Sequence, residues 1–167
     1  MTSVLLAAII LLIPMGNEAY TLKLTTKFRY GTRAMLDLGT HSSEKPVSLK
    51  EIAKRQDISP KYLETLFSIL QTSGTVRSVR GAQGGYQLAV DPADITLKRI
   101  FELFEDTGWL VECTADPSFC DRAEDCVTRE IWSELYDLCT NYLDSLNLKD
   151  LMDRVAEKAP TPDVYYI

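Results

Sequence analysis

The chain has 167 residues, 46% of them hydrophobic and 25% charged, which excludes a disordered, fibrous or disulfide-dense protein. The net charge of −6 is unevenly divided: residues 22–90 carry 11 Lys and Arg against 5 Asp and Glu, and residues 91–167 carry 7 against 18. This asymmetry favours a module that binds a polyanion, joined to a part that does not touch it.

Residues 1–21 form an apolar N-terminal extension, and the apolar run 4–15 within it is shorter than the ~20 residues that span a bilayer. Its length suits a signal peptide, but no Lys or Arg precedes it. We favour a third interpretation, in which the start codon is assigned too far upstream and the natural chain begins at Leu22. We therefore expect no membrane association and a cytoplasmic location.

Three helices are predicted next, from the spacing of apolar residues and from helix caps. The first covers about residues 26–40. The second, "SLKEIAKRQ", begins with a capping box formed by Ser48 and Glu51. Ser59 caps the third, with Pro60 at its first position, where the missing N–H of proline is harmless. Two short helices joined by a tight turn predict a helix-turn-helix.

The segment "TVRSVRGAQGGYQLAV" that follows predicts a β-hairpin with a glycine-rich tip. After it, "ADITLKRIFELFED", residues 129–146 and "LKDLMDRVAE" each have helical periodicity. The predicted fold class is therefore mainly α with a small β-hairpin wing. A winged helix-turn-helix domain would occupy residues 22–90, and residues 91–167 would form a second part.

A winged helix places its second helix in the major groove of DNA and its wing along the backbone or minor groove. Lys61, Arg77 and Arg80 would neutralise phosphates, and Glu64 would accept from a cytosine amino group. Taken singly, Glu64 could be a solvated surface charge, and Tyr62 a half-buried packing residue. The predicted DNA-binding residues are Ser59, Lys61, Tyr62, Glu64, Arg77, Arg80 and Gly84.

Three of the four cysteines lie in the polar stretch "VECTADPSFCDRAEDCVTREIW". Cys113, Cys120 and Cys126 have almost no apolar neighbours, so packing explains them poorly and a metal or redox site is indicated. Their gaps of six and five residues are too wide for a zinc ribbon, whereas iron–sulfur clusters accept varied spacing. Cys139, inside the long predicted helix, is expected to be an ordinary packed thiol.

Five segments in order resemble the IscR/NsrR-type (Rrf-two) family of winged-helix transcription regulators. They are "LKLTTKFRYGTRAMLDL", "SLKEIAKRQDISPKYLETLFSILQTSG", "VRSVRGAQGGYQLA", the three-cysteine loop and "CVTREIW", and together they cover about residues 22–155. The resemblance implies a homodimer paired through helix 129–146. It also implies a 2Fe–2S or 4Fe–4S cluster held by Cys113, Cys120 and Cys126. Residues 91–167 would then comprise a cluster-binding loop, a dimerisation helix and a C-terminal tail.

The chain departs from the family pattern at two positions. Arg129 stands where the cluster-assembly regulators have a histidine ligand, and Arg29 stands where the nitric-oxide sensors have an aspartate. Arginine is not a normal iron ligand. The fourth ligand therefore stays open among Glu130, Cys139, a residue of the partner chain, a small molecule, or none.

The predicted function is a repressor or activator that binds a double-stranded DNA operator with an affinity set by an iron–sulfur cluster. The signal would be cluster supply, iron, nitric oxide or redox stress. One alternative is a thiol redox switch without iron, and another is a winged-helix protein that acts through a protein partner. An enzyme is not expected, because no acid–base pair or nucleophile–base constellation occurs.

Overall fold

The computed structural model describes residues 24–42, 45–81, 83–105 and 110–158. The N-terminal extension and the last nine residues lie outside this part. The elements, in chain order, are α2 (Thr26–His41), α3 (Leu49–Gln56), α4 (Pro60–Thr72), β1 (Val76–Val79), β2 (Gly85–Leu88), η2 (Pro92–Asp94), α5 (Leu97–Phe104), α6 (Glu112–Ala115), η3 (Pro117–Phe119), α7 (Val127–Asp144) and α8 (Leu148–Lys158).

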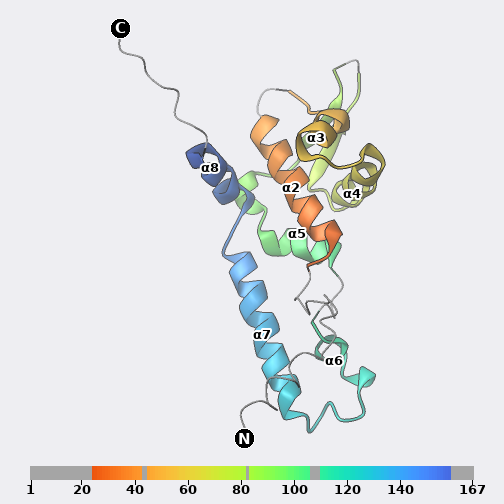
Figure 1. Cartoon of the computed structure of the whole chain (residues 1–167), viewed down its shortest axis with the longest axis vertical. Coiled ribbons are helices and arrows are strands. Elements are labelled where there is room, and N and C mark those ends of the chain that lie inside the picture. The colour runs from red at the N-terminus through yellow and green to blue at the C-terminus, as the bar shows by residue number, and fades with distance from the viewer. Residues whose placement is uncertain (1–23, 43–44, 82, 106–109, 159–167) are drawn as a thin grey trace, which may run out of the picture.

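Helices α2 to α5 gather with the hairpin at one end of the molecule, and α7 runs away from them (Figure 1). The segment with α6 and the cysteines lies at the far, N-terminal end of α7 (Figure 1). Helix α8 returns to pack beside α2. The described helices include none that is both long and apolar enough to cross a membrane.

The predicted helix starts are confirmed by the caps that the structure shows. The side chains of Thr25, Ser48 and Ser59 each accept a hydrogen bond from a backbone N–H in the first turn of their helix. Glu51 completes the capping box by accepting from the Ser48 N–H over 2.9 Å. Between α3 and α4, Asp57 adopts a left-handed conformation (φ 52°), which makes the tight turn of the helix-turn-helix.

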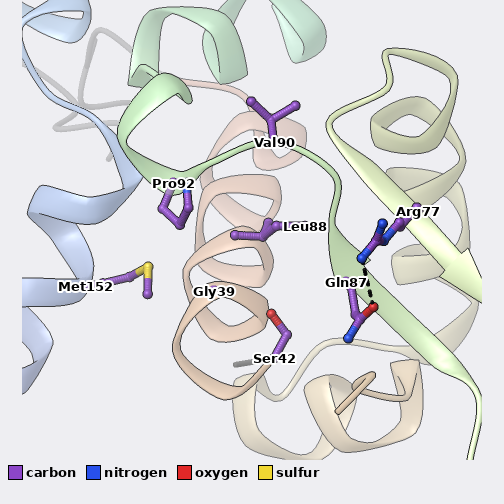
Figure 2. A pocket seen from close by; sticks show the side chains of 8 residues that line it. All are labelled: Gly39, Ser42, Arg77, Gln87, Leu88, Val90, Pro92 and Met152. Carbon is purple, nitrogen blue, oxygen red and sulfur yellow. Dashed lines mark hydrogen bonds between the residues drawn. The ribbon is translucent and has the colours of Figure 1, made fainter. Parts of the chain in front are cut away.

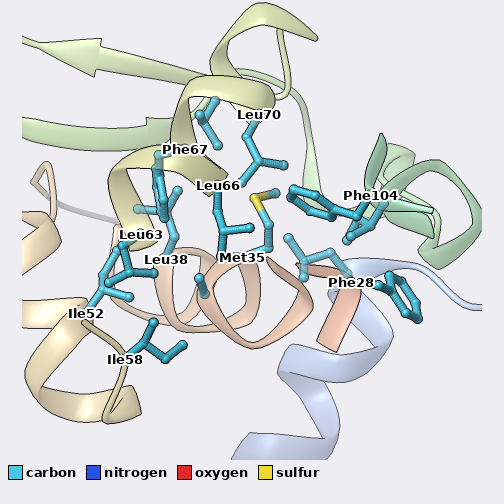
Figure 3. Packing of buried hydrophobic residues seen from close by; sticks show 14 of the residues in the cluster. Phe28, Met35, Leu38, Ile52, Ile58, Leu63, Leu66, Phe67, Leu70 and Phe104 are labelled. Carbon is cyan, nitrogen blue, oxygen red and sulfur yellow. The ribbon is translucent and has the colours of Figure 1, made fainter. Parts of the chain in front are cut away.

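One hydrophobic core holds the winged helix together (Figure 3). Met35 and Leu38 of α2 meet Leu63, Leu66 and Phe67 of α4, and all five side chains are fully buried. The core crosses the boundary expected at residue 90, because α5 and the start of α8 also pack on α2. The apolar spacing in the sequence therefore identifies the core residues, and their burial fixes how α3 and α4 sit on α2.

The wing is an antiparallel hairpin in which Val76 pairs with Leu88 and Val79 with Gly85. Val47 adds a bridge on the other side of β2, exchanging backbone hydrogen bonds of 2.9 and 2.8 Å with Tyr86. A side chain at Gly85 would place its Cβ 2.4 Å from the Val47 carbonyl oxygen, so this close approach requires glycine. The arrangement confirms the predicted winged helix.

Two helix boundaries differ from the prediction. Helix α7 runs over Val127–Asp144 and not over 129–146, because its N-cap is Cys126 and its last turn closes from the Ser145 N–H to the Asn141 carbonyl. The helix predicted from "ADITLKRIFELFED" is split into η2 and α5. The side chain of Thr96 caps α5 by accepting from the Arg99 N–H, which separates the two.

A buried ion pair joins α2 to α3. The Asp37 side chain is 1% exposed, and its carboxylate accepts hydrogen bonds from Nη2 of Arg55 (2.6 Å) and Nε2 of Gln56 (2.9 Å). The hydrogen bond to Asp37 raises the pKa of Arg55 above its ordinary value. A buried carboxylate must be paired in this way, so the three side chains fix the angle between the two helices.

Candidate DNA-binding surface and cysteine loop

The outward face of α4 has the features of a recognition helix. Leu63, Leu66, Phe67 and Leu70 turn into the core, which leaves Lys61, Glu64, Thr65 and Ser68 exposed. The exposed positions are three, four and seven residues from Lys61, so they lie on one side of the helix. Ser59 caps α4 and places Lys61 and Glu64 in its first two turns. Helix α4 thus presents a cation, a carboxylate and hydroxyl groups together.

Tyr62 is half-buried, unlike its exposed neighbours Lys61 and Glu64. Its ring contacts Tyr30 of α2 edge-to-face, with the ring centroids 6.1 Å apart. The guanidinium groups of Arg29 and Arg33 lie 5.9 and 5.4 Å from the Tyr30 ring centroid. Tyr62 therefore packs against α2, which agrees with the alternative prediction that it is a half-buried packing residue.

Arg29 and Arg33 extend the positive surface beyond the predicted residues. Both side chains are exposed, and Nε of Arg33 also donates to Oε1 of Gln56 at the end of α3 (3.2 Å). Neither arginine is among the DNA-binding residues predicted from the sequence. The sequence does contain a sign of this surface, because the four-residue spacing of Arg29 and Arg33 places both charges on the same face of the predicted helix.

In the wing, Arg77 and Arg80 are exposed. Nη2 of Arg77 donates to Oε1 of Gln87 on the opposite strand over 3.4 Å. The turn after Arg80 depends on two glycines. Gly81 has a φ of +121°, and a Cβ on Gly84 would lie 2.4 Å from the Val79 carbonyl oxygen. The absence of a side chain at Gly84 therefore allows the tight turn that follows Arg80.

The cysteine loop, residues 111–126, consists of α6, η3 and a series of turns. Cys113, Cys120 and Cys126 are all half-buried free thiols. Among the residues that the structure describes, no three His, Cys, Asp or Glu side chains come together as a metal-binding group. Three thiols on one polar loop are a donor set that fits an iron–sulfur cluster chemically. The loop would have to rearrange to bring all three to one point.

Arg129 ties this loop to α7. Its Nε donates to the Cys113 carbonyl over 2.8 Å, and its Nη1 donates to the Ala123 carbonyl over 3.5 Å. Ala123 is only 5% exposed, so the second contact reaches the inside of the loop. The residue that stands in place of an expected histidine ligand thus binds the loop backbone.

Cys126 differs chemically from the other cysteines because it is the N-cap of α7. The hydrogen bond with the Thr128 hydroxyl (Sγ to Oγ1, 3.2 Å) lowers the pKa of the Cys126 thiol, and the nearby backbone N–H of Arg129 lowers it further. The positive charge of Arg129 acts in the same direction. A helix N-terminus with a nearby cation is an environment that favours thiolate, the form that binds metals and attacks disulfides.

The two side chains considered as a fourth ligand lie on α7. Glu130 is exposed and four residues from Cys126, so the two share a helix face. Cys139 is half-buried and 13 residues from Cys126. At 1.5 Å per residue it lies about 20 Å further along the helix axis.

Comparison with known proteins identifies relatives over most of the chain. Residues 24–154 match the family model Rrf2, described as an iron-dependent transcriptional regulator. Protein rrf2 of Nitratidesulfovibrio vulgaris is 45% identical over 131 residues, which are 78% of this chain and 87% of that protein. The transcriptional regulator IscR of Photorhabdus laumondii is 39% identical over 132 residues, 79% of this chain and 80% of that one.

Several solved structures have a similar fold. The structure of T. potens IscR has a TM-score of 0.70 and 38% identity, and the match covers 86% of this chain and 96% of that one. The structure of CymR, the global cysteine regulator of B. subtilis, has a TM-score of 0.66 and 39% identity, with coverage of 80% and 98%.

Proposed function

Because the chain belongs to the Rrf2 family of transcriptional regulators, we propose that it binds operator DNA through α4 and the wing, and that the cysteine loop controls this binding. Members of this family are regulators and not enzymes. Operator binding would take place in the cytoplasm. The observation that carries this proposal is that the exposed side of α4 and the arginines of the wing belong to one folded unit with one hydrophobic core.

The proposed contacts divide by their chemistry. Lys61, Arg77 and Arg80 neutralise phosphates, and Glu64 reads a base edge from the first turns of α4. Arg29 joins the phosphate contacts from α2. Ser59 and Gly84 act through the backbone, by starting α4 and by closing the turn after Arg80. Tyr62 supports α4 from behind through Tyr30.

We propose a homodimer paired through α7. Four large apolar side chains on this helix are 52–70% exposed: Val127, Ile131, Leu138 and Tyr142. Steps of four and seven residues return to nearly the same side of a helix, so the four form one stripe. A second copy of the stripe would cover it, and two recognition helices would then address two half-sites.

Cys113, Cys120 and Cys126 are the proposed ligands of an iron–sulfur cluster, with Glu130 as the fourth. Glu130 is preferred to Cys139 because it is four residues from Cys126 and not about 20 Å along the helix. A bound cluster would supply a group that reacts with oxidants and nitric oxide. Arg129 passes any movement of the loop to the first turn of α7, since it holds both parts.

Control then follows from the position of the loop at the end of α7. If the dimer pairs through this helix, a shift at its first turn alters the separation of the two recognition helices. The loop thereby favours one of two dimer arrangements that differ in operator affinity.

A thiol switch is the second candidate, and a specific observation favours it. All three loop cysteines are free and half-buried, they do not converge on a metal-binding group in the described part of the chain, and Cys126 has a lowered pKa. A thiolate of this kind forms disulfides readily. One of the similar solved structures is an oxidised form of Staphylococcus aureus CymR.

The decisive experiment compares the anaerobically purified protein with the triple variant Cys113→Ala, Cys120→Ala, Cys126→Ala. Iron, sulfide and visible absorbance are measured, together with affinity for DNA fragments that the protein selects from a random pool. Cluster control predicts that the triple variant loses both the absorbance and the change of affinity on air exposure, and that Cys139→Ala retains both.

Other outcomes contradict parts of the proposal. An iron-free protein whose affinity follows reversible disulfide formation would establish the thiol switch. Equal affinity in every state would exclude control by the loop. Binding that shows no dependence on salt would contradict phosphate contact and favour a protein partner.

A further inference from the structure

A cavity of about 380 Å³ lies at the base of the wing, between the end of α2, strand β2 and α8 (Figure 2). This volume is within the range of small-molecule sites, roughly 300–1,000 Å³. Eight residues line it: Gly39, Ser42, Arg77, Gln87, Leu88, Val90, Pro92 and Met152. None of them belongs to the cysteine loop.

The polar groups of the cavity gather on the side of the hairpin. Figure 2 shows Arg77 and Gln87 in contact there, with Ser42 apart from them at the end of α2. The contact from Arg77 to Gln87 is 3.4 Å, which is long for a hydrogen bond, so a better acceptor can replace it. A guanidinium, an amide and a hydroxyl together offer several donors to one acceptor group.

The opposite side, toward α8, is apolar. Leu88, Pro92 and Met152 line it, with Val90 above them (Figure 2). Gly39 brings the backbone of α2 to the cavity, because a Cβ there would lie 2.9 Å from the Met152 sulfur and 3.6 Å from Leu88 Cδ1. The glycine thus allows α8 to approach α2 and leaves the cavity without a side chain from this position.

From this division we infer that the cavity binds a small carboxylate with a short apolar tail. The carboxylate accepts two hydrogen bonds from the Arg77 guanidinium, a geometry that arginine provides and lysine does not. Gln87 and Ser42 add further donors. The tail lies against Leu88, Pro92 and Met152.

The next step rests on the proposed function: occupancy of this site weakens operator binding. Arg77 is a proposed phosphate contact, and a bound carboxylate both neutralises its charge and keeps its side chain in the cavity. The ligand also bridges the wing to α8, which follows α7 in the chain. The site would therefore report a metabolite independently of the cysteines.

Binding is tested without DNA. Saturation-transfer NMR measures hexanoate and phenylacetate against the purified full chain, with hexanamide and phenylacetamide as neutral controls of the same shape. We expect the carboxylates to bind with dissociation constants of about 1 mM or tighter, and the amides about tenfold more weakly. Arg77→Gln should abolish the preference for the carboxylate.

Two variants that fill the cavity locate the site. Met152→Trp and Ser42→Leu should each reduce carboxylate binding at least about tenfold, while Arg154→Trp, on the other side of α8, should not. Circular dichroism identifies any variant that is unfolded. Failure of both carboxylates to bind, or unchanged binding in whichever cavity variants are folded, overturns the inference.

The effect on DNA is a separate measurement. Phenylacetate should weaken DNA binding by the wild type and have no effect on Ser42→Leu. Carboxylate binding with no DNA binding at all would leave the cavity assigned and reject the proposed function. Carboxylate binding that leaves DNA affinity unchanged would reject only the coupling between them.

Discussion

The Arg129 side chain donates a hydrogen bond to the Cys113 carbonyl over 2.8 Å, which joins the start of the cysteine loop to the first turn of α7. A second contact from the same guanidinium reaches the Ala123 carbonyl. One side chain therefore holds two separated points of the loop backbone. This role explains why an arginine is useful at a position where the cluster-assembly regulators have a histidine ligand.

Arg129→Ala should loosen the loop even when no metal is present. The loss of a charged donor to each backbone carbonyl lowers the stability of the loop by about 1–2 kcal/mol. Amide exchange over residues 113–123 should therefore accelerate about tenfold or more. Hydrogen–deuterium exchange of the iron-free protein measures this. Arg154→Ala, at an exposed position on α8, is the control. Unchanged exchange in Arg129→Ala would show that other contacts hold the loop.

Arg80→Gln should weaken DNA binding evenly across sequences, because phosphate contacts carry no base information. The slope of log affinity against log salt should fall by about 1 for the one lost contact. Fluorescence anisotropy at several salt concentrations gives this slope. Lys158→Gln removes one positive charge from the end of α8 and should leave the slope unchanged. Equal slopes for the wild type and Arg80→Gln would remove Arg80 from the DNA interface.

Leu138→Glu should dissociate the proposed dimer. Leu138 is 68% exposed in the single chain, and a second copy of the stripe would bury it. A charge placed in such an interface loses its hydration without gaining a partner. Sedimentation velocity should show monomers at concentrations where the wild type is dimeric. Ser133→Glu adds the same charge to the other side of α7, and a monomer there too would indicate a general effect of charge.

The parts of the fold that the sequence predicts well depend on neighbours in the chain. Ser48 with Glu51, and Ser59 with Pro60, mark helix starts within three residues, and the glycines after Arg80 mark the turn of the wing. These signals suffice for the winged helix. The sequence leaves open whether Tyr62 contacts DNA or packs against the protein, because its partner Tyr30 lies 32 residues away in the sequence.

Contacts between distant residues could not be predicted in this way. The donation from Arg129 to Cys113 spans 16 residues, and the pair of Asp37 and Arg55 spans 18. Each depends on how helices and loops pack, which composition and spacing do not report. The sequence shows Arg129 only as a departure from a ligand pattern, and its contacts with the Cys113 and Ala123 carbonyls are visible only in the structure.

Asp37→Ala should strongly destabilise the protein. It leaves the Arg55 guanidinium, which is 32% exposed, without the carboxylate that it binds with two nitrogens. Loss of one partner of a buried pair lowers the free energy of unfolding by about 3 kcal/mol. Urea denaturation measures this value. Asp153→Ala breaks the exposed pair with Lys149 and should cost at most about 1 kcal/mol. Similar values for both variants would contradict a structural role for the buried pair.

The Glu51 capping box should make stability depend on pH. Hydrogen bonds from the Ser48 side chain and backbone lower the pKa of Glu51 in the folded protein. Its contribution is therefore complete above the pKa of this carboxyl in the unfolded chain, and is lost as the pH falls through the lower folded value. Thermal melting of the wild type and Glu51→Gln should differ at pH 7 and converge in acid. A difference that persists below the folded pKa would mean that the charge of Glu51 does not stabilise α3.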